Sequence, residues 1–105
     1  MYGFDEAKNK KSVVQPITTN IILDSSQWAY NEILGIYAQS VSVTGVTENS
    51  AVIVAPNPAI GYGAVYYWNE SKIQCYDQAD GMLKFTCDPD HIPTANISVN
   101  VMILG

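Results

Sequence analysis

The sequence contains no arginine and few cations of any kind. Its five basic residues are all lysines, against ten acidic residues, so the 105-residue chain has a net charge of −5. Proteins that bind nucleic acid neutralise phosphates with lysine and arginine and read bases mainly with arginine. The composition therefore argues against nucleic-acid binding.

Three of the lysines, Lys8, Lys10 and Lys11, lie close together near the N-terminus. Residues 1–16 show no sustained periodicity and end at a proline, which cannot occupy a central strand. We expect residues 1–16 to form an N-terminal arm whose lysines are solvated. The alternative is an attachment arm that docks on an acidic surface of a partner.

Long apolar runs are also missing. No stretch approaches the roughly 18 to 20 apolar residues that cross a bilayer, and the first residues lack the charged-then-apolar order of a signal peptide. We therefore expect that the protein does not insert into a membrane and that it is intracellular when made. A virion or a secretion apparatus could still carry the protein outside.

Residue types that perform catalysis or bind metals are scarce. His91 is the only histidine, and it lies in a proline-flanked loop with no nucleophile motif in the sequence, so a surface residue explains it better than a catalytic base. Asp88 and Asp90 stand in the same turn, where aspartate side chains commonly bond nearby backbone amides. Cys75 and Cys87 are lone thiols that cannot complete a zinc site. We expect no enzymatic activity, no cofactor and no metal.

The two cysteines lie in the arms of a predicted hairpin, and their pairing depends on its register. A two-residue turn at Asp80-Gly81 would place Cys75 opposite Thr86, whereas a three-residue loop would place the cysteines directly opposite each other. Because neighbouring apolar residues share the alternation of the cysteines, we interpret both as small, buried, reduced core residues. A disulfide is the alternative.

Short segments with alternating apolar and polar residues are abundant. Within Gln39–Pro56, Val41 and Val43 alternate with serine and threonine, the pattern of a strand buried on one side, and turn-forming residues precede Val52–Val54. We interpret Gln39–Pro56 as a hairpin of two strands. In total, strands are expected at residues 18–24, 36–44, 51–55, 72–77, 82–87 and 95–104.

Six strands separated by turn signals predict an all-β fold, an antiparallel β-sandwich or jelly-roll-like domain of about six to eight strands. This domain is expected to occupy residues 17–105, with Trp28 filling one end of its core. The exception is residues 62–71, where Ala64 and the spacing of Val65 and Trp68 permit one or two turns of helix.

Four aromatic residues cluster in the same segment: Tyr62, Tyr66, Tyr67 and Trp68. Such rings can fill the end of a sandwich or pack against another subunit, and we favour these roles. Alternatively, exposed rings can stack on sugars. These four residues are the candidate contacts to a ligand or an interface.

The succession of strands and turns has a recognisable sequence pattern. Its residues are Trp28, Tyr37–Thr47, Asn49–Pro56, Ile73–Cys75 with Gln78, Leu83–Cys87 and Ile97–Gly105. This pattern resembles a β-domain of phage and prophage virion structural proteins from Gram-positive gut bacteria, of the tail-fibre, baseplate or fibre-tip type. The opening, Met1–Asp5 with Asn9–Lys10, resembles the starts of short phage proteins.

The resemblance implies a non-enzymatic virion structural protein for attachment or host-surface recognition. It also implies a homo-oligomer, with a trimer as the expected state, that contacts other virion proteins; a host cell-wall glycan is a further candidate partner. No functional residue follows from it. Two alternatives stay open: a capsid decoration or head-fibre protein, and a fibronectin-like adhesive module of a bacterial surface protein.

Overall fold

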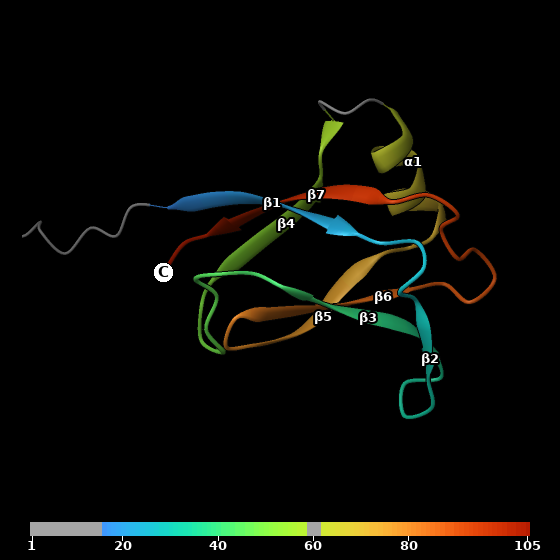
Figure 1. The fold of residues 1–105 in the computed structure, drawn as a ribbon, viewed down its shortest axis with the longest axis horizontal. Coiled ribbons are helices and arrows are strands. Elements are labelled where there is room, and N and C mark those ends of the chain that lie inside the picture. Colours follow the sequence, from blue (N-terminus) through green and yellow to red (C-terminus); the bar gives the residue numbers. More distant parts are fainter. Residues whose placement is uncertain (1–15, 59–61) are drawn as a thin grey trace, which may run out of the picture.

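The computed structural model describes residues 16–58 and 62–105, which form seven strands and one helix (Figure 1). No helix in these two ranges is long and apolar enough to cross a membrane. The elements in chain order are β1 (Ile17–Leu23), β2 (Ala29–Asn31), β3 (Ile36–Ser42), β4 (Val52–Pro56), α1 (Tyr62–Glu70), β5 (Gln74–Ala79), β6 (Met82–Cys87) and β7 (Ile97–Ile103).

The strands form two antiparallel sheets. One sheet has the order β1-β7-β4 and the other the order β2-β3-β6-β5. Figure 1 shows β1 and β7 above β3, β5 and β6, with α1 beside β7. The prediction of an all-β antiparallel sandwich with one short helical segment is confirmed.

A single core lies between the sheets. In β7 the odd-numbered residues from Ile97 to Ile103 are buried and Met102 is exposed, as the alternation predicts, but Ser98, which was expected on the other face, is also buried. The two halves of the core meet because each sheet turns one apolar face inward. Its fully buried large side chains include Leu23, Leu83, Phe85, Ile97, Val99 and Val101, and Trp28 belongs to the same cluster.

The predicted hairpin within Gln39–Pro56 is wrong, because β3 and β4 belong to different sheets. The connecting loop instead pairs with the turn between β5 and β6: Val43 N donates to Gly81 O at 2.8 Å, and Gly81 N donates to Val46 O at 2.7 Å. Val43 and Val46 are both buried. Anchored in this way, the chain crosses from one sheet to the other instead of reversing beside β3.

Strand β2 was missed by the sequence prediction. It is only three residues long and pairs with β3 through a turn that includes Gly35, whose φ is +73°. The side chain of Asn31 stabilises this turn, because its Oδ1 accepts hydrogen bonds from the backbone N of Ile33 and of Leu34, both at 3.0 Å. So short a strand has too few residues to show a periodicity.

Both cysteines are free thiols, as expected, but only Cys87 is fully buried; Cys75 is half-buried. The turn at Asp80-Gly81 has two residues, yet Cys75 lies opposite Phe85 and not opposite Thr86. The cause is a β-bulge at position 76, which inserts one extra residue in β5 and shifts the register beyond it.

Helix α1 confirms the predicted helical segment. It ends in a Schellman motif: Ile73 N donates to Trp68 O at 3.1 Å and Lys72 N donates to Asn69 O at 3.2 Å, with Lys72 at φ +50°. Trp68 and Ile73 both pack against the core. This ending turns the chain directly from α1 into β5.

Candidate functional site

The candidate residues named from the sequence do not form one surface. Lys8, Lys10 and Lys11 lie outside the described residues, and so does the side chain of Tyr62, where α1 begins. Tyr66 is 46% exposed, whereas Trp68 is half-buried and meets Phe85 edge-on with 6.5 Å between ring centroids.

Tyr67 lies between these extremes. It is half-buried, its ring stands edge-on to Tyr66 at 5.4 Å, and its hydroxyl forms a 2.8 Å hydrogen bond with Thr94 Oγ1. Consecutive helical residues point about 100° apart, so these rings cannot form a flat platform. Tyr66 and Tyr67 border a hollow of about 110 Å³ beside His91, well below the roughly 300 Å³ at which small-molecule sites begin.

His91 sits in the loop after β6, where its Nδ1 is 3.5 Å from Asp88 Oδ2. Asp88 also accepts a 2.9 Å hydrogen bond from the backbone N of Asp90, as expected for an aspartate in a turn. That bond, with His91 and the ammonium of Lys72, lowers the pKa of Asp88. Among residues 16–58 and 62–105, no group of three or more His, Cys, Asp or Glu could hold a metal ion.

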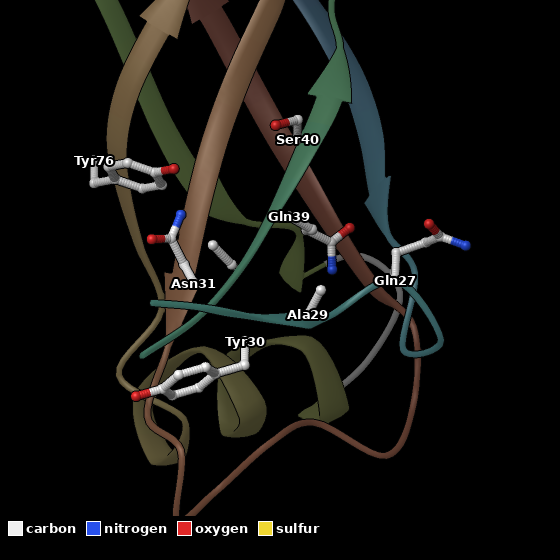
Figure 2. A pocket seen from close by; sticks show the side chains of 8 residues that line it. Gln27, Ala29, Tyr30, Asn31, Gln39, Ser40 and Tyr76 are labelled. Carbon is white, nitrogen blue, oxygen red and sulfur yellow. The ribbon is translucent and has the colours of Figure 1, made fainter. Parts of the chain in front are cut away.

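A groove that the sequence did not suggest lies on the four-stranded sheet (Figure 2). Its volume is about 300 Å³. It draws on β2, β3 and β5 and on the segment just before β2, and none of its lining residues is charged. They are Gln27, Ala29, Tyr30, Asn31, Ala38, Gln39, Ser40 and Tyr76.

The groove lies on the side of the sheet that faces away from the core. Ala38 and Ser40 alternate along β3 with the core-facing Gln39 and Val41. Because their side chains are small, the surface between the taller neighbours is hollow. The aligned pairs Ala29–Ala38 and Ser40–Lys84 show that β2, β3 and β6 run side by side beneath it.

Tyr30 and Tyr76 are the two aromatic residues that line this groove. Figure 2 shows the Tyr76 ring and the Asn31 amide on the same side of β2, whereas Tyr30 points to the other side. There Tyr30 meets Tyr37 edge-on, with 5.6 Å between centroids. Tyr76 is the extra residue of the β5 bulge and is 39% exposed. Bulges redirect side chains at sheet edges, and β5 is an edge strand.

Several polar groups at the groove keep hydrogen-bonding capacity. The Oδ1 of Asn31 is used in the β2–β3 turn. Its Nδ2, the side-chain amide of Gln27, the Ser40 hydroxyl and the Tyr76 hydroxyl form no hydrogen bond with any residue in the described part of the chain. These groups can therefore bond a ligand without breaking a bond inside the protein.

The loop that presents Gln27 is fixed by the side chain of Gln39. This amide is 7% exposed; its Oε1 accepts from Asp24 N at 3.2 Å and its Nε2 donates to Asp24 O at 3.0 Å. The Asp24 carboxylate accepts hydrogen bonds from the hydroxyl and backbone N of Ser26, which lower its pKa. The Gln39 clasp, meaning these two bonds to Asp24, holds one wall of the groove.

A second hollow of about 410 Å³ lies on the other side of Tyr76. Glu48 and Asp77 line it, so it is acidic, and the Gln78 amide beside it already donates to Thr47 O and Ser50 O. It therefore offers fewer unused neutral donors than the groove. Tyr76 separates an uncharged surface from an acidic one.

The arrangement in the groove suits binding better than bond chemistry. The rings of Tyr30 and Tyr76, the side-chain amides and the Ser40 hydroxyl stand around a shallow floor of small side chains, and no lining residue is charged. Comparisons with protein-family models, with curated proteins and with solved structures found no match to this chain.

Proposed function

We propose that this chain is a non-enzymatic structural domain of a phage virion, of the tail-fibre or baseplate type, that recognises a neutral saccharide on the host surface. The virion setting rests on the sequence resemblance. The observation that supports saccharide recognition is the uncharged groove bordered by Tyr76.

The chemistry of a sugar matches the groove in two ways. The C–H face of a pyranose packs on an aromatic ring, and Tyr76 offers one that is 39% exposed. Hydroxyl groups both donate and accept hydrogen bonds, which matches the amides of Gln27 and Asn31 and the hydroxyl of Ser40. None of the residues that line the groove is charged, and the neighbouring Lys84 ammonium is paired with Asp77 Oδ2 at 3.8 Å, so the groove favours a neutral sugar over a phosphorylated or acidic one.

An array of neutral and anionic bacterial cell-wall glycans tests this proposal. We expect the full chain to retain neutral saccharides and to lose that binding when Tyr76 is replaced by alanine. Tyr66→Ala is the matched control, because Tyr66 is similarly exposed but lies on α1, outside the groove. Binding of anionic glycans alone, or equal loss in both variants, would contradict the proposal.

A capsid decoration or head-fibre protein is the second candidate. The turn between β2 and β3 presents two apolar residues to solvent, Ile33 at 95% and Leu34 at 42% exposure, and Figure 1 shows this hairpin projecting from the body. An apolar tip suits contact with a protein shell. Co-purification with heads instead of tails would favour this role.

A further inference from the structure

The three-stranded sheet contains no charged residue. β1, β7 and β4 are built entirely from apolar, hydroxyl and amide residues and one proline. The charged side chains of the described residues lie elsewhere, in the four-stranded sheet, in α1 and in the loops. In a chain of net charge −5, a whole sheet without charge is a distinct surface.

The side of this sheet that faces away from the core exposes large apolar side chains. Ile22, Ile53 and Met102 are 46%, 55% and 38% exposed. Ile53 and Met102 are register partners on β4 and β7, so they form an adjacent apolar pair, whereas Ile22 lies opposite Ser98. Asn20 and Asn100, partners on β1 and β7, add uncharged amides to the same face. We call this surface the neutral face.

The chemistry of the neutral face fits a second copy of the chain. Two acidic copies repel each other wherever carboxylates meet, so a like-with-like contact needs a surface without them. Interface cores are depleted of charge in general. A basic partner would instead select the acidic side of the molecule, where Glu48, Asp77 and Asp80 lie.

We propose that copies of this chain associate through the neutral face, sheet against sheet. The inference rests on the composition and exposure of this sheet and not on the saccharide groove, which is on the other sheet. A contact between the same face of two copies is isologous and closes as a dimer, so it differs from the trimer that the sequence resemblance implies.

The size of the face sets the expected affinity. Three strands of five to seven residues cover roughly 14 Å by 23 Å, which is less than the roughly 800 Å² per partner of a standard stable interface. Association is therefore expected in the micromolar range or weaker. Sedimentation of the full chain should be followed from about 10 µM to about 500 µM.

Ile53→Lys is the test variant. It places a cation on the neutral face of each copy, so the two cations repel each other at the contact. The net negative charge of the chain falls at the same time, so the overall repulsion between copies decreases and cannot explain weaker association. We expect at least a tenfold weaker association. Ile33→Lys is the matched control, because Ile33 is even more exposed and lies on the β2–β3 turn of the other sheet, outside the neutral face. This variant should associate as tightly as the unaltered chain.

A mixing experiment separates lost contact from misfolding. Ile53→Lys and Ile53→Glu should each associate weakly, and an equimolar mixture should associate more tightly than either, because opposite charges then face each other. Unchanged circular dichroism and glycan binding would show that both variants fold. An unaltered chain that stays monomeric up to the highest concentration, equal effects of Ile53→Lys and Ile33→Lys, or a mixture no tighter than its components would overturn the proposal.

Discussion

Replacing Gln39 by alanine tests the clasp that fixes the wall of the groove. The change removes two hydrogen bonds to the backbone of Asp24, at 3.2 Å and 3.0 Å, from a side chain that is 7% exposed. Each such bond contributes about 0.5 to 1.5 kcal/mol. The free energy of unfolding should therefore fall by about 1 to 3 kcal/mol.

Thermal melting followed by circular dichroism measures this loss. For a domain of this size a change of 1 kcal/mol shifts the melting temperature by about 4 to 8 °C, so a loss near 2 kcal/mol lowers it by about 8 to 16 °C. Ser42→Ala is the control, because Ser42 is exposed on the same strand and should change stability by less than about 0.5 kcal/mol. Equal melting temperatures for the two variants would refute the reasoning.

Gln39→Glu adds a pH dependence whose sign follows from the same geometry. The introduced carboxyl group, when protonated, can donate to Asp24 O as the amide does, but its ionised form would face that carbonyl oxygen in a buried site. Its folded pKa should lie above the ordinary glutamate value of about 4.3. The variant then has its highest stability at pH values below the pKa of this glutamate in the unfolded chain, and it loses stability as the pH rises through the higher pKa of the folded protein. Its deficit relative to the unaltered chain should grow from pH 4 to pH 7; a constant deficit would contradict this.

Two further predictions concern the backbone and the thiols. Lys72 and Gly81 both have positive φ, +50° and +73°, a conformation that glycine adopts more easily than other residues. Lys72→Gly should therefore raise the free energy of unfolding by about 0.5 to 1 kcal/mol, and Gly81→Ala should lower it by about 1 to 2 kcal/mol. Chemical denaturation measures both changes, and shifts of the same sign would contradict the argument. Burial, followed by the charge of Asp88, raises the pKa of Cys87 to about 11, and Cys87 is 1% exposed while Cys75 is half-buried. Iodoacetamide at pH 8 should therefore modify Cys75 well before Cys87, as read by mass spectrometry, and equal rates would be inconsistent with the fold.

Much of the fold could be predicted from the sequence because its signal is local. The alternation in β7 follows directly from burial of one face of a strand, and the Cys hairpin was placed around its turn at Asp80-Gly81. The pairing of Gln39–Pro56 could not be predicted in this way, since it depends on contacts of the loop with Gly81, far along the chain. The bulge at Tyr76 has no local signal either, so neither of the two expected registers of Cys75 is the observed one.

The candidate site was harder to predict than the fold. The clustered aromatic residues at 62–68 predicted a contact surface. A helix, however, distributes consecutive side chains around its axis, and Trp68 packs against Phe85 in the core. The groove gathers residues from β2, β3, β5 and the segment before β2, and only the sheet topology brings these segments together. Tyr76 alone between Cys75 and Asp77 gives no sequence pattern to recognise.

Calorimetric titration of Tyr76 variants with a purified neutral cell-wall polysaccharide tests the central claim most directly. Loss of a stacking contact of about 1.4 kcal/mol weakens binding about tenfold, so we expect that loss for Tyr76→Ala. Tyr76→Phe, which keeps the ring and removes only the hydroxyl, should bind within a few-fold of the unaltered chain, and Tyr66→Ala should bind like it. Undiminished binding by Tyr76→Ala, or no binding by the unaltered chain to any neutral polysaccharide, would contradict the account.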